Sequence, residues 1–544
     1  MLLLKPQLGI FLLLSHAVIH HLTLGEEVFR SIARLRVLVS VERELIKALR
    51  EYISVSRDLL KTGQAPSKYP LINGRTINIY ERRLEEVTKL RDGAVGDSDV
   101  HVTHPVLAFK LLKRYMKLWN YLMVEVDKDI GKDIVAVMER HRNFLPNDTD
   151  FIGACRAIAR LQSTYKISAK AMADGALPGE IHKDHGGLSV DDCFFIGQEA
   201  FNDNDDYFCV IWMEEGLRRY RQGYPIMPWE DVKETIMIEF QAYCYFRAGL
   251  YHKAVKYTSE LLALDPENVH GLHNKATFGE ALSKSNRTLE EEPRYPPTDE
   301  DERYHENCRG EFNPSNVVHP QELICRYVSD HPLIRLLRIG EEVLNVNPRI
   351  VMFRRLLDDN ETNIMKKLAL PYLSISRIVG AEKTFGVVIQ DRVSNTAWLS
   401  DEDYPDTIIP KLTKRLELVT GLSADDAEPY QVLNYGIGGH YKPHLDADSY
   451  STSRAVNERV ATLLIYLSDV EYGGGTVFVK HGVRANPKKG DAAFWYNMNK
   501  SGQIDFSMEH GACPVLLGEK WIINKWFNYN GQISHRKCGL SSEE

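Results

Sequence analysis

The hydrophobic period of the sequence changes near residue 330, and this change limits the folds open to the chain. Before it, apolar residues recur at helical spacing. After it come short β-branched and aromatic runs bounded by glycine, such as RVATLLIYLSDV, GDAAFWYN and EKWIINKWFNYNG. At 544 residues the chain is too long for one core and has room for about three or four domains. We therefore predict a multidomain α + β protein with a helical N-terminal half and a C-terminal β-sandwich or barrel over residues 331–544.

Amphipathic helix patterns dominate the first 145 residues. Apolar side chains between residues 38 and 59 alternate at spacings of three and four, and HPVLAFKLLKRYMKLWNYL repeats the pattern. Three or so heptads suit an intramolecular bundle and a dimer interface equally well, so both stay open for this coiled-coil-like assembly domain, residues 18–145. The first seam comprises Leu38, Val41, Leu45, Ala48, Tyr52, Val55 and Leu59, and the second comprises Phe109, Leu112, Met116 and Trp119.

Two stretches between residues 146 and 282 resemble one another: IGQEAFNDNDDYFCVIWMEEGLRRY and AYCYFRAGLYHKAVKYTSELLALDPEN. The second has the small-residue and aromatic pattern of a tetratricopeptide unit, and such helical pairs stack into a concave face suited to extended peptides. Plain helical packing is the alternative. The acidic, proline-rich stretch SKSNRTLEEEPRYPPTDEDERYHEN follows, and its composition predicts a linker over residues 283–330.

The first 17 residues have the features of a secretory signal: one charge at Lys5, a short apolar run over residues 8–14 and a small-x-small cleavage site. No later run approaches eighteen apolar residues, so we expect no membrane span. The formal net charge of −8 gives no electrostatic reason to expect a nucleic-acid partner. Four glycosylation sequons fit the secretory pathway: Asn147, Asn286, Asn360 and Asn499.

The chain has eight cysteines, and an oxidising compartment lets suitably placed thiols pair. We expect two disulfides, Cys308 with Cys325 and Cys513 with Cys538. The other four cysteines lie in helix-like patterns, where a free cysteine usually acts as a small core residue. They are Cys155, Cys193, Cys209 and Cys244.

A candidate metal site lies at the start of the β region, in HYKPHLDAD. A non-haem iron that activates oxygen needs two imidazoles and one carboxylate on one face. His444 and Asp446 are two apart, so in an extended segment both point to the same face. His510 offers the third ligand. Ten residues later, Lys520 stands in an otherwise apolar strand, which is costly unless an anion pairs with it, and a dicarboxylate ligand would do so.

These motifs resemble the catalytic domain of the 2-oxoglutarate-dependent dioxygenases, a double-stranded β-helix or jelly-roll, and specifically the collagen prolyl 4-hydroxylase alpha-subunit family. The similarity is strongest in YQVLNYGIGGHYKPHLD, GGGTVFV, KKGDAAFWYN and HGACPVLLGEKWIINKW. It implies that Fe(II) binds the His-Asp-His set and that Lys520, where a related lysyl hydroxylase family has arginine, receives the distal carboxylate of 2-oxoglutarate. Tyr435 and Thr476 match positions near the co-substrate. His440 stands where the resemblance suggests glutamine, and we expect it at the surface.

The same resemblance extends, more loosely, to the helical half. It implies dimerisation through the N-terminal segment and binding of proline-rich peptides by the middle domain, with Tyr207 and Asn274 at peptide-contact positions. His270 and Thr277 depart from the arginine and tyrosine expected there, which puts peptide affinity or length preference in doubt. The implied partner is protein disulfide isomerase, in an alpha2-beta2 tetramer, whose retention signal would hold the complex in the endoplasmic reticulum lumen.

The predicted function is hydroxylation of peptidyl proline at C4 in collagen-like X-Pro-Gly sequences, with O2 as co-substrate and 2-oxoglutarate converted to succinate and CO2. Ascorbate enters because the family consumes it to rescue oxidised iron. One rival is hydroxylation of another secreted proline-rich substrate. A second is a non-catalytic peptide-binding assembly protein, against which the intact triad and buried lysine argue.

Overall fold

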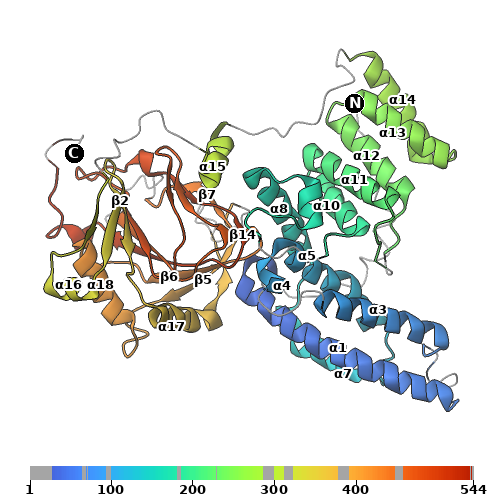
Figure 1. Cartoon of the computed structure of the whole chain (residues 1–544), viewed down its shortest axis with the longest axis horizontal. Helices are drawn as coiled ribbons and strands as arrows, with labels where there is room; N and C mark the ends of the chain where they lie inside the picture. The colour runs from blue at the N-terminus through green and yellow to red at the C-terminus, as the bar shows by residue number, and fades with distance from the viewer. Residues whose placement is uncertain are drawn as a thin grey trace.

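The chain forms a helical N-terminal half and a C-terminal β domain in the computed structural model (Figure 1). The predicted signal segment and Asn286 lie outside the residues that the structure describes. Those residues are 27–63, 69, 71–92, 100–180, 186–227, 230–285, 299–311, 323–377, 391–447, 458–539 and 541.

Helix α1 (Ile32–Lys61) is the long helix against which the other helices of the N-terminal region pack. The Ser31 hydroxyl caps its first turn by accepting a hydrogen bond from the Arg34 amide at 3.3 Å. The predicted seam is buried from Leu38 to Tyr52 against helices of the same chain, whereas Val55 is 48% exposed. Over most of its length the seam therefore packs as an intramolecular bundle. The other elements here are Val28–Arg30, α3 (Gly74–Asp92), α4 (Val100–Thr103), α5 (Pro105–Arg114), the π-helical turn Tyr115–Trp119, α6 (Asn120–Glu125), α7 (Lys132–Arg140) and Arg142–Phe144.

Antiparallel helical hairpins follow, as the repeat pattern predicts. Asn147 and Ser189 each begin a helix with a capping box, in which the side chain accepts a backbone amide and an aspartate three residues on accepts the cap's own amide. The tetratricopeptide-like interpretation is confirmed. The helices are α8 (Asp148–Tyr165), α9 (Ala169–Asp174), α10 (Val190–Asn202), α11 (Asp206–Arg221), α12 (Glu234–Arg247), α13 (Tyr251–Leu264) and α14 (Val269–Ser283).

Helix α15 (Asp299–Arg309) lies within the segment that composition marks as a linker. Tyr304 donates a hydrogen bond from its hydroxyl to the Ala512 carbonyl at 2.7 Å, and Cys308 bonds to Cys513. Its sequence is too polar to indicate burial, but Tyr304 and Cys308 join a small core cluster with Val477 and Cys513 of the β domain. The helix therefore fastens the linker onto the β domain.

The β domain packs two antiparallel sheets face to face, which agrees with the predicted jelly-roll. The large sheet has the order β1-β2-β3-β12-β8-β15-β6-β5-β4, the small sheet has the order β11-β10-β13-β7, and β14 pairs with β9. The strands are β1 (Cys325–Tyr327), β2 (Gly340–Asn345), β3 (Ile350–Arg354), β4 (Ser374–Ile375), β5 (Ser394–Leu399), β6 (Tyr430–Tyr435), β7 (Tyr441–His444), β8 (Arg459–Tyr466), β9 (Tyr472–Gly473), β10 (Thr476–Phe478), β11 (Val483–Ala485), β12 (Ala492–Tyr496), β13 (His510–Ala512), β14 (Val515–Leu517) and β15 (Trp521–Asn528).

Alternation along the strands sends side chains to two different cores. One face of the large sheet packs against α17 (Asp359–Ala369) and α18 (Ile409–Thr420), with the short α16 (Pro332–Leu337) beside them. The opposite face packs against the small sheet through an aromatic core that includes Tyr435 and Trp495. Two candidate metal ligands, His444 and His510, lie on the small sheet beside this inner core, and Asp446 follows just after β7.

Both expected disulfides in the C-terminal half are wrong. Cys308 pairs with Cys513, at a Cα separation of 5.5 Å, and Cys325 and Cys538 are exposed free thiols. Helix α15 packs against β10 next to β13, which brings Cys308 to the residue just after β13. Cys325 lies instead in β1, at the far edge of the large sheet.

The helical cysteines also differ in part from expectation. Cys209 of α11 and Cys244 of α12 form a disulfide, because these helices are neighbours in the stack and present both thiols to the shared core. Cys155 and Cys193 are free and fully buried, as predicted for small core residues.

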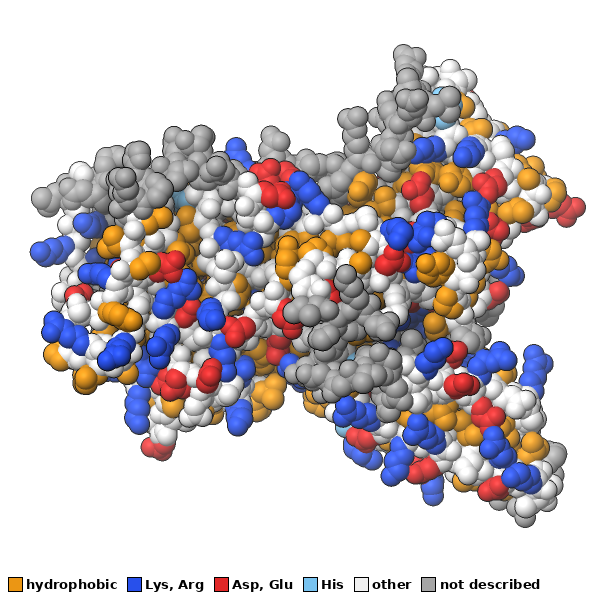
Figure 2. Space-filling model, in the orientation of Figure 1, with side chains coloured by type: hydrophobic (Ala, Val, Ile, Leu, Met, Phe, Trp, Pro, Cys, Tyr) orange, Lys and Arg blue, Asp and Glu red, His pale blue; other side chains and the backbone are white. Residues whose placement is uncertain are grey.

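Charged side chains of both signs intermingle on the visible face of the molecule (Figure 2). Among the helices of the described segments, none combines the length and apolar character needed to cross a bilayer.

Candidate metal centre

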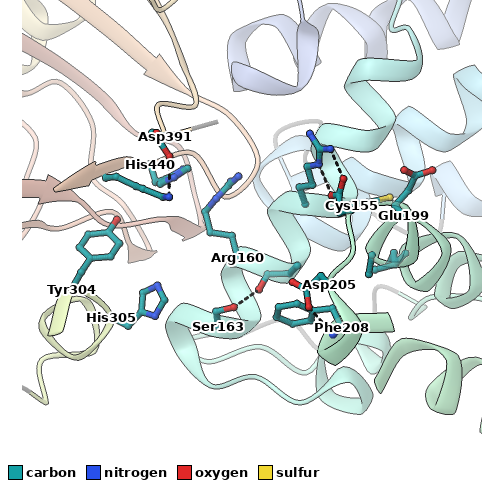
Figure 3. A pocket seen from close by; sticks show the side chains of 16 residues that line it. Cys155, Arg160, Ser163, Glu199, Asp205, Phe208, Tyr304, His305, Asp391 and His440 are labelled. Atoms are coloured by element: carbon teal, nitrogen blue, oxygen red, sulfur yellow. Dashed lines mark hydrogen bonds and ion pairs between the residues drawn. The ribbon is translucent and has the colours of Figure 1, made fainter. Parts of the chain in front are cut away.

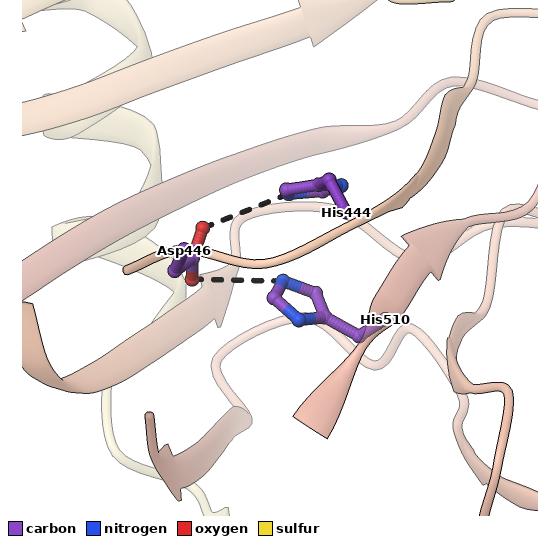
Figure 4. A group of neighbouring side chains, drawn as sticks. All are labelled: His444, Asp446 and His510. Carbon is purple, nitrogen blue, oxygen red and sulfur yellow. Dashed lines mark ion pairs between the residues drawn. The ribbon is translucent and has the colours of Figure 1, made fainter. Parts of the chain in front are cut away.

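Three predicted ligands meet at one end of the small sheet (Figure 4). His444 ends β7 and lies directly opposite His510, which begins β13 in the antiparallel ladder. Asp446 follows two residues after His444. Its Oδ1 lies 3.6 Å from His444 Nε2, and its Oδ2 lies 3.5 Å from His510 Nε2. All three ligand atoms fall within 4.8 Å of one another, which fits a single ion.

Hydrogen bonds to backbone carbonyls fix both imidazoles in the tautomer that a metal requires. His444 donates from Nδ1 to the Lys442 carbonyl at 2.8 Å, and His510 donates from Nδ1 to the Met508 carbonyl at 3.0 Å. A carbonyl can only accept, so each Nδ1 carries a proton, and in the neutral ring each Nε2 can then offer its lone pair to a metal ion. Two imidazoles and one carboxylate oriented in this way form the donor set that non-haem iron uses.

The electrostatics of the site also favour metal binding. Burial lowers the pKa of His510 to about 4, so its ring is neutral at physiological pH. Burial alone would raise the pKa of Asp446, but the His510 and His444 rings hold it well below the usual value. The carboxylate is therefore ionised and the imidazole neutral, which are the protonation states of metal ligands.

Two polar residues that sequence reasoning missed orient the carboxylate. Thr462 of β8 donates from Oγ1 to Asp446 Oδ2 at 2.6 Å, and Asn497 donates from Nδ2 to Thr462 Oγ1 at 2.9 Å. Such supporting hydrogen bonds hold a ligand in place and tune its basicity. In the sequence, Thr462 appears only as a threonine within the apolar run RVATLLIYL. A threonine that faces solvent would look the same, so the sequence did not indicate its role.

Lys520, just before β15, has a fully buried side chain. Its Nζ has no hydrogen-bond partner in the described part of the chain and lies 4.8 Å from the centre of the Tyr435 ring. Burial lowers the pKa of its ammonium to about 7. The side chain does not reach the surface, and an unpaired buried ammonium is the feature expected of a site for an anionic ligand.

Tyr435 and Thr476 are both buried, and the Tyr435 ring contacts this lysine. Thr476 Oγ1 accepts a hydrogen bond from the Tyr466 hydroxyl at 2.8 Å. The backbone favours glycine at Gly474, which has φ +65° and whose Cβ position lies 3.4 Å from Lys520 Cδ. The motif GGGT therefore lets the chain pass close to the lysine stem.

The expected surface position of His440 is wrong, because the residue is only 2% exposed. It lies just before β7, and the neighbouring Gly438 carbonyl accepts a hydrogen bond from Arg160 of α8 at 2.9 Å. The segment that leads into the metal-bearing strand is thus covered by the helical half.

The predicted peptide-contact residues lie on separate helices. Tyr207 is half-buried on α11, and Asn274 is partly exposed on α14. His270 Nδ1 lies 2.5 Å from Glu239 Oε1 of α12, so this departure from the family pattern forms an interhelical contact. Thr277 is exposed.

Three sequons lie within the described residues. Asn147 caps α8, Asn360 is exposed in the first turn of α17, and Asn499 is partly exposed after β12.

Known protein families match segments in both halves of the chain. Residues 68–179 match the prolyl 4-hydroxylase alpha-subunit N-terminal region, and residues 190–284 match the prolyl 4-hydroxylase peptide-substrate-binding domain. Residues 430–528, which contain all three ligands and Lys520, match the 2OG-Fe(II) oxygenase superfamily.

Individual relatives are similar over nearly the full length. Prolyl 4-hydroxylase subunit alpha-1 of Rattus norvegicus is 34% identical, with 95% of this chain and 96% of that protein covered. Subunit alpha-2 of Gallus gallus is 33% identical, with 98% and 99% covered, and subunit alpha-2 of Caenorhabditis elegans is 30% identical, with 95% and 94% covered. The chain therefore belongs to the prolyl 4-hydroxylase alpha-subunit family, with a 2-oxoglutarate- and Fe(II)-dependent oxygenase as its C-terminal domain.

Proposed function

We propose that this chain hydroxylates peptidyl proline at C4 in collagen-like X-Pro-Gly sequences, with 2-oxoglutarate and O2 as co-substrates. The observation that carries the proposal is the pairing of a preformed His-Asp-His ligand set with an unpartnered buried lysine in one β-sandwich. A ligand set alone would fit many metalloproteins. The lysine adds a place for a dicarboxylate, which is what this class of oxygenase consumes.

In this proposal each residue has a positional or electrostatic task. His444, Asp446 and His510 hold Fe(II), and Thr462 keeps the Asp446 carboxylate oriented. Lys520 binds the distal carboxylate of 2-oxoglutarate and positions it by a charge-assisted bond. When bound, Fe(II) supplies oxygen activation, so that one oxygen atom enters the C–H bond and the other enters the succinate formed with CO2.

The apolar core around the ligands limits access of water. Phe478 and Trp495 contact the His510 ring, at centroid distances of 5.7 and 4.7 Å. Tyr435, beside Lys520, belongs to the same core cluster as these two residues. An environment of this kind strengthens the lysine–carboxylate attraction and protects a reactive centre from side reactions.

The proposed setting is the endoplasmic reticulum lumen, with protein disulfide isomerase as the beta subunit of an alpha2-beta2 tetramer and ascorbate as the reductant of oxidised iron. Two disulfides, Cys209–Cys244 and Cys308–Cys513, support an oxidising compartment. The signal-like first residues and the sequons support it independently.

The test uses the full chain co-expressed with a protein disulfide isomerase. Succinate release from 2-oxoglutarate should depend on added Fe(II) and increase strongly with (Pro-Pro-Gly) repeats. An iron-loaded complex that ignores these peptides would refute the collagen-like substrate. Turnover with another proline-rich secreted peptide would then favour the rival substrate that the departures at His270 and Thr277 leave open.

A further inference from the structure

The boundary between the helical half and the β domain is only partly filled by side chains. A polar cavity of about 390 Å³ lies between α8 and the segment before β7 (Figure 3). A second cavity of about 270 Å³ adjoins it, since Arg156 and Arg160 line both, and Phe29 and Arg30 line the second. The walls of a cavity lack the contacts that would hold them together, so specific bonds elsewhere along this boundary carry more of that task.

Residues 28–36, which we call the N-terminal strap, cross this boundary. Phe29 donates its amide to Asp150 Oδ1 of α8 at 2.9 Å, and its carbonyl accepts the amide of Ile437, just after β6, at 3.2 Å. The strap continues into α1, which begins beside the β domain (Figure 1). The backbone of one residue is thus bonded to both halves of the molecule.

Glycine makes room for the strap on both sides. A Cβ at Gly436 would lie 1.9 Å from the Phe29 carbonyl oxygen, and a Cβ at Gly153 of α8 would lie 2.4 Å from the Phe29 ring. Any other residue at these two positions would therefore displace Phe29. Both halves of the chain provide a gap that the strap occupies.

Asn434 of β6 receives the strap. Its side chain is fully buried, and its Oδ1 accepts hydrogen bonds from the Ser31 hydroxyl at 2.5 Å and the Ala33 amide at 3.0 Å. A backbone amide can only donate, so the NH2 group of Asn434 must point the other way. That NH2 group donates to Glu519 Oε1 at 3.1 Å and lies 3.5 Å from the Lys520 carbonyl. Asn434 thus links the strap to the two residues that lead into β15.

Glu519 is a second link between the strap and Lys520. Its Oε1 accepts hydrogen bonds from Arg36 of the strap at 2.8 Å and from the Trp521 indole N–H at 2.7 Å. Its backbone carbonyl accepts the Ser468 hydroxyl at 2.7 Å. These bonds, on either side of Lys520, hold the backbone from which the lysine side chain extends.

Lys520 depends on this support because its ammonium has none of its own. Among the described residues Nζ has no hydrogen-bond partner, whereas the Lys520 carbonyl accepts the Tyr435 amide at 3.1 Å. Asn434 and Tyr435 are adjacent in β6 and point to opposite faces, so Asn434 faces the strap while the Tyr435 ring contacts the lysine. Asn434 therefore acts on a bound ligand only through Lys520 and its strand.

We propose that Asn434 and Glu519 are positioning residues that make the affinity for 2-oxoglutarate depend on the N-terminal strap. The inference rests on the proposed function, in which Lys520 binds the distal carboxylate. A hydrogen bond to a carboxylate depends on distance and angle, so a shift of the lysine backbone weakens it. Binding free energies are reciprocal, so bound 2-oxoglutarate should in turn hold the strap more firmly against the β domain.

The test measures 2-oxoglutarate binding by calorimetry without O2, using the full chain co-expressed with a protein disulfide isomerase and loaded with Fe(II). Glu519→Ala should raise Kd at least about fivefold, which is the effect of one net hydrogen bond. Glu519→Gln keeps an acceptor for Asn434, Arg36 and Trp521, so its Kd should stay within about twofold of the wild-type value. If both variants weaken binding equally, the charge of Glu519 matters rather than its hydrogen bonds, and the proposal is wrong.

Ser31→Ala tests the strap itself. It removes a hydroxyl that donates to Asn434, so Kd and KM for 2-oxoglutarate should rise about three- to fivefold, while kcat and KM for peptide stay near wild type. The matched control is Ser168→Ala, which removes the cap of α9, where the hydroxyl accepts the Ala171 amide at 3.1 Å. Both variants lose a helix cap and should melt at a lower temperature. If Ser31→Ala changes only the melting temperature, the strap has a purely structural role and the proposal is wrong.

Hydrogen–deuterium exchange of the wild type decides the matter even if the variants fail to fold. Added 2-oxoglutarate should slow amide exchange across residues 28–36 at least about threefold, because the coupling is reciprocal. Unchanged exchange in the strap would overturn the inference while prolyl hydroxylation stands. A wild-type complex that binds no 2-oxoglutarate would refute the proposed function and the inference with it, so the two failures are distinguishable.

Discussion

Replacement of Lys520 by methionine should change stability and co-substrate binding in opposite directions. Methionine keeps most of the volume and the apolar stem but removes the ammonium. In the ligand-free protein, burial holds the pKa of this lysine at about 7, against an ordinary value of 10.5. That difference corresponds to about 5 kcal/mol for keeping the group charged, at 1.36 kcal/mol per pKa unit. Lys520→Met should therefore raise the melting temperature of the ligand-free protein by several degrees.

The same variant should lose its affinity for 2-oxoglutarate. Removing one partner of a desolvated charge pair typically costs about 2–5 kcal/mol, so KM for 2-oxoglutarate should rise at least about tenfold, while peptide affinity stays near that of the wild type. Lys520→Arg should also bind poorly, because its planar fork is bulkier than the ammonium that is fully buried at this position.

Lys525→Met is the matched control, because Lys525 lies in β15, five residues after Lys520. Lys525 is 4% exposed and lies 4.3 Å from the Tyr430 ring centre, but its Nζ donates to the Glu428 carbonyl at 2.6 Å. Its replacement should leave KM for 2-oxoglutarate unchanged. Thermal shift with and without 2-oxoglutarate, combined with steady-state kinetics, measures both effects. Equal 2-oxoglutarate dependence in wild type and Lys520→Met would refute the assignment.

Three further predictions follow from the site and its disulfide. His510→Ala should abolish turnover but preserve calorimetric binding of (Pro-Pro-Gly) repeats by the helical domain; surviving turnover would remove His510 from the metal site. Non-reducing peptide mapping should recover Cys308 linked to Cys513, and Cys308→Ser should destabilise the protein by about 2–5 kcal/mol; mapping that finds both thiols free would contradict the structure. KM for 2-oxoglutarate should rise as pH increases above about 7, because the charged form of Lys520 binds the co-substrate and becomes scarce there. Over pH 7 to 10.5 the unfolded lysine holds more protons than the folded one, so Lys520 should make ligand-free stability rise with pH, and a KM that is flat with pH would oppose this account.

Local spacing made the metal site predictable. His444 and Asp446 are two residues apart, and an extended segment would place them on one face. In the structure β7 ends at His444 and Asp446 lies in the bend that follows, yet both side chains still reach the same site. His510 was expected only as a histidine from a distant strand. The antiparallel register that places it opposite His444 was not predicted, because pairing partners are not encoded in either strand alone.

The errors arose where tertiary packing decides the outcome. Cys308 is near Cys325 in sequence, yet α15 packs on the small sheet and takes Cys308 to Cys513. His440 is polar and lies in a polar stretch, yet the helical half covers it. In both cases the decisive contact joins segments far apart in the chain, and no local pattern reports such a contact.

The most direct test of the account is the fate of isotopically labelled O2 in the wild-type complex with (Pro-Pro-Gly) repeats, Fe(II) and 2-oxoglutarate. The account predicts equal amounts of 4-hydroxyproline and succinate, with one labelled oxygen in each product. Hydroxyproline without matching succinate, or with its oxygen drawn from water, would contradict it.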